Sequence, residues 1–477
     1  MKITRRTFTP LLFSAFAACS KPEAAPEQAS EGQFEPNWPS IQSHKLPAWF
    51  DDAKLGIFVH WGLYSVPAWA TPLGELGTIE PEVWFKNNPY AEWYLNSLRI
   101  PDSPTRKHHV ETYGADFDYY QFADKFNEES AKWDPAAMAK VFSDVGARYV
   151  VLTSKHHDGF TLWPSKVENP HADGRVLHSA RDIVGDMGKA VRDAGMIMGY
   201  YYSGGLDWTF TQEPVETFEQ VRGTIIHTDE FARYADAHWR ELMADYDTSI
   251  LWNDIGYPRQ GDLVHIFPEF YNSTPEGVIN NRFETGIKGD PPRHHDFTTP
   301  EYAKMDEITD YKWETCRGLG YSFGYNAVEG EEQTIGEGEL IQLLADIVSK
   351  NGNLLLNVGP RPDGSIPEIQ LARLQALGDW LDVNGEAIFD TRPWQRAEAK
   401  TADGLDVRFT RNGGDVYAIV FGDPAGKEIV IPDAPSGKVA LLGAGELEAS
   451  SADGALKVKM PAAPPSKHAH ALKITTA

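Results

Sequence analysis

Cysteine is almost absent from this chain, whose 477 residues include only Cys19 and Cys316. No intramolecular disulfide can form if Cys19 is removed or lipidated. Zinc sites built on several cysteines are excluded, and no local Cys–His pairing suggests a cysteine nucleophile. The chemistry of the protein is therefore expected to rest on other side chains.

Basic residues are also scarce. Lys and Arg total 44 against 69 Asp and Glu, which gives a formal net charge of −25 at pH 7. Nucleic-acid binding requires basic patches that neutralise phosphates, so this balance argues against it. The length and a hydrophobic content of 42% suit one large enzyme domain with a smaller one. Fourteen Trp residues are compatible with stacking on sugars, and equally with a large core.

The N-terminus has the pattern of an export signal. Arg5 and Arg6 precede an apolar run over 11–18 that ends at Cys19 and is too short to span a bilayer. The paired arginines indicate Tat export, and residues 16–19 resemble a lipobox. We therefore predict a signal peptide over 1–19 and a lipid on Cys19. An ordinary signal peptide with an incidental cysteine is the alternative.

The residues that follow predict a location and a tether. Ser20, next to Cys19, suggests sorting to the outer membrane, so we expect a periplasmic enzyme that touches the membrane only through its lipid. Residues 20–40 are rich in Pro, Glu, Ala and Ser, a composition typical of a disordered segment.

Residues 41–390 alternate short apolar runs with amphipathic stretches, as expected for repeated strand–helix units. The runs expected as buried parallel strands are 55–60, 149–154, 196–203, 249–254, 277–282 and 353–358. Helical spacing of apolar residues occurs at 138, 141, 142 and 145, and again at 340, 343, 344 and 347. Gly146 and Gly195 are expected to end two helices.

Two features favour a TIM-like (β/α) barrel over a doubly wound sheet. No glycine-rich phosphate loop follows the first expected strand. Polar residues gather instead at the ends of several strands, including His60, His156, His157, Asp254 and Arg282. In barrels such ends converge on one active site.

Residues 391–477 have a different pattern. Short alternating runs over 406–410, 415–421, 427–431, 438–442, 455–460 and 471–475 are separated by Gly, Pro, Asn and Asp. This spacing predicts an antiparallel β-sandwich.

Asp254 is the candidate nucleophile. It ends an expected strand, and Gly256 and Pro258 follow at once, which disfavours a simple helix-capping role. A carboxylate at the mouth of a barrel suits attack on an anomeric carbon. A retaining glycosidase needs a second carboxyl group, and the candidates by position are Glu284, Asp296, Glu301, Glu307 and Glu314.

Seven motifs, in this order along the chain, together resemble the glycoside hydrolase family 29 α-L-fucosidases. They are Val59-His60-Trp61-Gly62, Tyr90-Ala91-Glu92-Trp93-Tyr94, Lys155-His156-His157-Asp158-Gly159-Phe160, Tyr201-Tyr202-Ser203, Leu251-Trp252-Asn253-Asp254, Ser322-Phe323-Gly324-Tyr325-Asn326 and Gly352-Asn353-Leu354-Leu355-Leu356-Asn357-Val358. The resemblance extends from about residue 47 to the C-terminus.

The resemblance implies a retaining exo-enzyme that acts on fucosylated oligosaccharides or glycoconjugates without a metal or organic cofactor. It implies that Asp254 is the nucleophile and Glu301 the acid/base. It places these residues around the sugar: His60, Glu92, Trp93, His156, His157, Tyr201, Trp252, Arg282 and Phe323.

Three other functions stay open at this point. An α-L-galactosidase or related exo-glycosidase would differ only in the pocket around C6 of the sugar. A non-catalytic carbohydrate-binding lipoprotein would not need both Asp254 and Glu301. A metal-dependent amidohydrolase would gather histidines at strand ends, but usually with a His-x-His pair on the first strand, where this chain has only His60. A homo-oligomer is possible.

Overall fold

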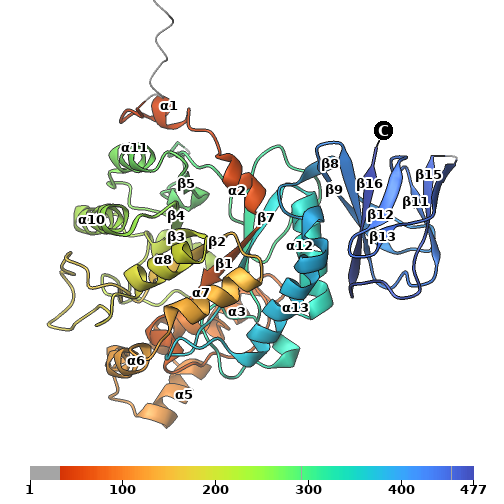
Figure 1. The fold of residues 1–477 in the computed structure, drawn as a ribbon. Helices are drawn as coiled ribbons and strands as arrows, with labels where there is room; N and C mark the ends of the chain where they lie inside the picture. Colours follow the sequence, from red (N-terminus) through yellow and green to blue (C-terminus); the bar gives the residue numbers. More distant parts are fainter. Residues whose placement is uncertain (1–32, 292, 453, 477) are drawn as a thin grey trace, which may run out of the picture. The chain divides into compact units, whose positions relative to one another are not determined.

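Parallel strands form the inner wall of the catalytic region in the computed structural model, which describes residues 33–291, 293–452 and 454–476. Their hydrogen-bonded order is β5-β4-β3-β2-β1-β7-β6 (Figure 1). The strands are β1 (Leu55–Val59), β2 (Tyr149–Lys155), β3 (Ile197–Ser203), β4 (Ile250–Asp254), β5 (Val278–Ile279), β6 (Trp313–Gly318) and β7 (Gly352–Val358). Ile57 lies opposite Val150 on one side and Leu356 on the other. Burial on both faces explains why most of these strands read as apolar runs.

An irregular segment, residues 296–301, completes the ring between the two edge strands. Parallel bridges join Phe297 to Asn280, directly after β5, and Thr298 to Trp313 of β6. A third bridge joins Glu301 to Cys316. Pro300 has no N–H to donate, which prevents a regular ladder here. The segment therefore takes the eighth position of the predicted (β/α) barrel and ends at Glu301.

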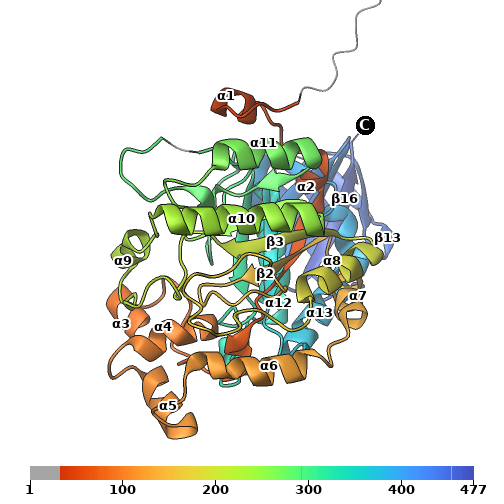
Figure 2. The same ribbon diagram turned by 90° about the vertical axis from the view of Figure 1, so that its left-hand side faces the viewer.

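Helices cover the outside of this ring. Figure 2 shows α10 and α11 side by side in front of β3. The longer helices of the region are α5 (Pro104–Tyr113), α6 (Phe122–Ser130), α7 (Pro135–Asp144), α8 (Ile183–Asp193), α10 (Asp229–Tyr246), α11 (Leu263–Ser273), α12 (Glu337–Ser349) and α13 (Glu368–Asn384). The shorter ones are α1 (Trp38–Ile41), α2 (Ala48–Ala53), α3 (Pro81–Lys86), α4 (Tyr94–Arg99) and α9 (Phe218–Gly223).

The two helices predicted from apolar spacing are α7 and α12. Asp134 caps α7 by accepting hydrogen bonds from the backbone N–H groups of Ala136 and Ala137, both at 3.1 Å. Gly146 and Gly195 follow α7 and α8 with φ of +89° and +80°, the left-handed conformation in which helices commonly end. Both predicted helix ends are confirmed.

The strand prediction was wrong in two places. β6 was missed because Glu314, Thr315 and Arg317 interrupt any apolar run. The strand expected over 277–282 is only Val278–Ile279, because the chain turns into the 3₁₀ helix η4 (Asn281–Phe283) at once.

Antiparallel strands follow the barrel and form the predicted β-sandwich. One sheet has the order β13-β12-β16-β10-β9-β8 and the other β11-β15-β14. The strands are β8 (Arg392–Lys400), β9 (Asp406–Asn412), β10 (Asp415–Phe421), β11 (Glu428–Pro432), β12 (Lys438–Leu441), β13 (Gly445–Glu446), β14 (Ala449–Ala452), β15 (Ala455–Lys459) and β16 (Ala469–Thr475). Val407, Phe409 and Ile429 belong to its separate apolar core. β8 and β9 contact α12 of the barrel (Figure 1).

The predicted tether over 20–40 lies largely outside the described residues, as do the signal peptide and Cys19. Where the structure describes it, the predicted disorder is wrong. Trp38–Ile41 forms α1, and the backbone N–H of Phe34 donates to Asn272 Oδ1 at 2.7 Å. Phe34 also packs on Tyr271, which provides the apolar contact that composition alone did not reveal. Within the described residues, no helix has the length and apolar character needed to span a membrane.

Candidate active site

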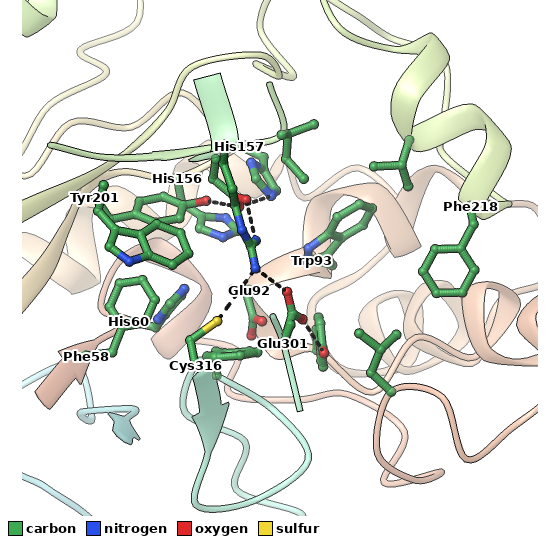
Figure 3. A pocket seen from close by; sticks show the side chains of 18 of the residues that line it. Phe58, His60, Glu92, Trp93, His156, His157, Tyr201, Phe218, Glu301 and Cys316 are labelled. Carbon is green, nitrogen blue, oxygen red and sulfur yellow. Dashed lines mark hydrogen bonds and ion pairs between the residues drawn. The ribbon is translucent and has the colours of Figure 1, made fainter. Parts of the chain in front are cut away.

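All eleven side chains predicted for the site line one cavity of about 140 Å³ at the C-terminal ends of the barrel strands. Asp254 is the last residue of β4, His60 follows β1, and Glu301 ends the irregular segment that closes the ring. Figure 3 shows how the labelled members face this space. The lining shared with the prediction is His60, Glu92, Trp93, His156, His157, Tyr201, Trp252, Asp254, Arg282, Glu301 and Phe323.

Asp254 is held as a carboxylate. Arg282 Nη1 donates to Oδ1 at 2.7 Å and the Tyr201 hydroxyl donates to Oδ2 at 2.8 Å. Burial raises the pKa of Asp254, but the charge of Arg282, with smaller contributions from His157 and the two hydrogen bonds, holds that pKa below its ordinary value. A buried, ionised carboxylate at a barrel mouth is suited to nucleophilic attack.

Glu301 is bound to the other end of the same guanidinium. Arg282 Nη2 lies 3.3 Å from Glu301 Oε2, and the Tyr90 hydroxyl donates to Oε1 at 2.8 Å. The side chain of Glu301 is 22% exposed and that of Asp254 10%, so Glu301 lies nearer the mouth. The guanidinium is itself fixed, because its Nε donates to Thr299 Oγ1 at 2.8 Å and it lies 4.8 Å from the centre of the Trp252 ring.

His60 is neutral, and one of its ring nitrogens has no hydrogen-bond partner among the described residues. The amide of Asn357 donates to the Phe323 carbonyl, so its Oδ1 accepts the hydrogen bond from His60 Nδ1 at 2.6 Å. Burial lowers the pKa of His60 to about 3. With Nδ1 carrying the proton, Nε2 is a hydrogen-bond acceptor.

His157 has the same arrangement. Ser203 donates its hydroxyl to the Leu206 carbonyl and accepts from His157 Nδ1 at 2.6 Å. Burial lowers the pKa of His157 to about 4, although Asp254 opposes this. Its Nε2 lies 3.9 Å from Asp254 Oδ2 and therefore faces the reaction centre. Two ring nitrogens in this cavity, Nε2 of His60 and of His157, are thus able to accept hydrogen bonds from hydroxyl donors.

A third carboxyl group, that of Glu92, lies deep in the cavity. Glu92 is 2% exposed and accepts from the Gly324 backbone N–H at 2.7 Å and the Ser322 hydroxyl at 3.2 Å. Burial raises the pKa of Glu92 to about 7. Its depth suits binding of a hydroxyl group better than proton transfer to a group that must leave through the mouth.

Comparison with known proteins agrees with this geometry. A family model described as alpha-L-fucosidase matches residues 22–386. The chain is 31% identical to human tissue alpha-L-fucosidase over 450 residues, which cover 91% of this chain and 89% of the relative. The chain belongs to the α-L-fucosidase family. It is therefore a glycoside hydrolase.

Solved structures of α-L-fucosidases share the fold over nearly the whole chain. The Thermotoga maritima alpha-fucosidase in complex with fucose is 44% identical, with a TM-score of 0.83, and the alignment covers 92% of this chain and 100% of that one. An alpha-L-fucosynthase from the same organism, in complex with a fucosyl-fucosyl azide, is 45% identical with a TM-score of 0.85 over 93% and 99% of the two chains.

The other carboxyl candidates for the fucosidase acid/base lie elsewhere among the described residues. Glu314 is fully buried and accepts from Tyr149 at 2.6 Å and Trp252 at 2.9 Å. Asp296 is bound by His44 and Tyr271, both at 2.8 Å. Glu284 and Glu307 are exposed. Of the five candidates, Glu301 is the one that lines the cavity.

The three cavity histidines do not form a metal centre in the part of the chain that the structure describes. The one group there with three potential ligand atoms within 4.8 Å of one another is His44, His294 and Asp296, which lies outside the cavity lining. The residues that line the fucosidase cavity thus offer no grouping suited to the metal chemistry of an amidohydrolase.

Sequence reasoning missed several residues of the cavity. Tyr90 begins the motif Tyr90-Ala91-Glu92-Trp93-Tyr94, but nothing in the sequence showed that its hydroxyl donates to Glu301. Cys316 lines the cavity from β6, and Thr299 holds Arg282 from the neighbouring irregular segment, and no apolar run in the sequence predicted either segment. Phe85 and Phe218 line the cavity from two short helices that lie far apart in the chain.

Proposed function

We propose that this chain is an exo-acting, retaining α-L-fucosidase that removes terminal α-L-fucose from oligosaccharides or glycoconjugates by double displacement. The observation that carries the proposal is the pair of carboxyl groups, Asp254 and Glu301, hydrogen-bonded to opposite ends of the Arg282 guanidinium. Retaining glycosidases need two carboxyl groups about 5–5.5 Å apart. One guanidinium between the two carboxyl groups is compatible with such a spacing.

In the first step Asp254 Oδ attacks the anomeric carbon and the glycosidic C–O bond breaks. Glu301 transfers its proton to the departing oxygen, so a fucosyl-enzyme ester and a free leaving group result. In the second step Glu301 takes a proton from water, whose oxygen attacks the same carbon and releases Asp254. Two inversions leave the released fucose in the α configuration.

The shape and lining of the cavity support removal of one terminal sugar. The inner end of the cavity is closed by buried side chains such as His60, His157 and Tyr201, which suits a single terminal sugar rather than a chain that continues in both directions. His60 and His157 accept hydrogen bonds from its hydroxyls, and Trp252 and Phe323 pack on its apolar side. The fucose bound to the Thermotoga maritima enzyme, 44% identical to this chain, supports the same ligand here.

Discrimination against α-L-galactosides must rest on more than the methyl group of fucose. Burial of one methyl group contributes only about 0.8 kcal/mol, so a hydroxyl at C6 must also be excluded by steric contact or by the loss of its hydrogen bonds. The test compares p-nitrophenyl α-L-fucoside with the α-L-galactoside. We expect fast release of nitrophenol from the fucoside alone, and comparable rates on both would contradict the assignment of fucose.

We also propose that the enzyme is exported and tethered to the outer membrane through a lipid on Cys19, facing the periplasm. The support is the sequence pattern of residues 5–19, which lies outside the described residues. A periplasmic location would bring the enzyme to oligosaccharides that enter from outside the cell.

A further inference from the structure

The cavity has a second, open end that the fucose-binding residues do not occupy. Phe218, on α9, lines the cavity and is 45% exposed, whereas Tyr201 is 1% exposed. Figure 3 shows Phe218 at the opposite side of the cavity from Tyr201, His60 and Phe58, with Glu301 between them. Phe218 therefore stands at the mouth.

Three aromatic side chains, Trp84, Phe85 and Phe218, form what we call the aromatic shelf. The rings of Trp84 and Phe218 are nearly parallel, at 16° with centroids 6.0 Å apart, and Phe85 meets Phe218 edge-on at 4.6 Å. Trp84 also meets Tyr90 edge-on at 4.9 Å, and Tyr90 donates to Glu301. The shelf is thus connected to Glu301 through one residue.

The position of Glu301 shows which side the leaving group occupies. In a retaining mechanism the acid must reach the departing oxygen, while the nucleophile attacks from the opposite face. A second, polar cavity of about 680 Å³ shares Val221, Asp254, Ile255 and Arg282 with the first, but Glu301 is not part of its described lining. That polar cavity lies on the side of the nucleophile, and the aromatic shelf lies on the side of the acid.

From this arrangement, and resting on the proposed function, we propose that the aromatic shelf is the leaving-group subsite and that it takes a pyranose sugar. The C–H groups on one face of a pyranose carry partial positive charge and pack on the negative face of an aromatic ring. Phe218 offers such a ring, because its side chain is 45% exposed. Trp84 is only 3% exposed and supports the Phe218 ring from the inner side.

The test compares two substrates that differ in the leaving group, α-L-fucosyl-(1→2)-galactose and α-L-fucosyl fluoride, which carries no sugar to contact the shelf. We expect Phe218→Ala to lower kcat/KM on the disaccharide about three- to tenfold, the range of an aromatic contact. Its kcat/KM on the fluoride should stay within twofold. Phe218→Trp, which keeps a ring, should restore the disaccharide rate.

Variants in the polar cavity serve as the matched control. Arg222 and Lys288 are exposed and line that cavity, so Arg222→Ala and Lys288→Ala should leave both substrates unaffected. A disaccharide-specific loss in these variants and not in Phe218→Ala would overturn the proposal. An equal loss on both substrates in Phe218→Ala would also overturn it, because Phe218 would then act on fucose binding. Inactivity of the unmodified enzyme on the fluoride would instead refute the proposed function.

Discussion

Arg282 Nη1 donates a 2.7 Å hydrogen bond to Asp254 Oδ1 in a site where burial alone would raise the pKa of Asp254. The positive charge of the guanidinium outweighs burial, so the pKa of Asp254 lies below its ordinary value. In the proposed mechanism the attack needs the ionised carboxylate, so we expect Arg282 to set the acidic limb of the pH–rate profile.

Replacement of Arg282 by Met should therefore move the acidic limb of the kcat/KM profile to higher pH. Without the guanidinium, burial raises the pKa of Asp254 and a larger fraction is protonated at a given acidic pH. Arg282→Lys keeps a charge and should shift the limb less. A pH–rate profile with an activated aryl fucoside measures both, and an unchanged limb in Arg282→Met would show that another group controls the ionisation of Asp254.

Glu301→Ala should cost roughly 10²–10⁴-fold on a fucosyl disaccharide, whose leaving oxygen needs a proton. The rate of the step that breaks the glycosidic bond should fall much less on 2,4-dinitrophenyl fucoside, because its leaving group departs without a proton. Steady-state rates on the two substrates measure the difference. Normal hydrolysis of the disaccharide by this variant would place the acid/base at another residue.

Glu314→Gln is the matched control for Glu301, because Glu314 is buried beneath the cavity and lies outside its lining. Burial raises the pKa of Glu314 to about 7. Its folded pKa thus exceeds its unfolded value, so the stabilisation from its bound proton is complete below about pH 4 and is lost as the pH rises through about 7.

A glutamine cannot ionise, and it can still pair with Tyr149 and Trp252 through its amide. The Tm of Glu314→Gln relative to that of the unmodified protein should therefore be higher at pH 8 than at pH 5. The dependence of its rate on the leaving group should be the same as in the unmodified enzyme. Thermal unfolding at the two pH values tests this. The same Tm difference at both values would show that Glu314 does not titrate in this range.

Cys19→Ala should release the protein from the membrane fraction without loss of activity, because the active site lies far along the chain in the barrel. Metabolic labelling with a fatty-acid analogue and detergent phase partitioning measure the lipid directly. If the unmodified enzyme enters the aqueous phase, the export signal is an ordinary one and Cys19 is incidental.

Sequence patterns predicted the parts of the site that regular strands position. Asp254 and His60 follow apolar runs, and the rule that strand ends converge in a barrel brought them together. Glu301 could be assigned only through family resemblance, because Pro300 breaks its segment into isolated bridges with no strand pattern. β6 was missed because Glu314 and Arg317 interrupt its apolar character.

Contacts between distant segments were outside the reach of sequence patterns. The hydrogen bond from Tyr90 to Glu301 joins residues 211 positions apart. Phe34 packs on Tyr271, and this contact holds the start of the described chain against the barrel although its composition is typical of disorder. Both depend on tertiary packing, which periodicity does not encode.

We propose Asp254 as the nucleophile and Glu301 as the acid/base of a retaining reaction. The most direct measurement is the anomeric configuration, by NMR, of the fucosyl azide formed when azide is added to Asp254→Gly and Glu301→Ala with an activated fucoside. In Asp254→Gly, azide replaces the missing nucleophile and should give the inverted β-fucosyl azide. In Glu301→Ala, azide attacks the fucosyl-enzyme and should give the α product. The same configuration from both variants, or an α product from Asp254→Gly, would contradict these roles.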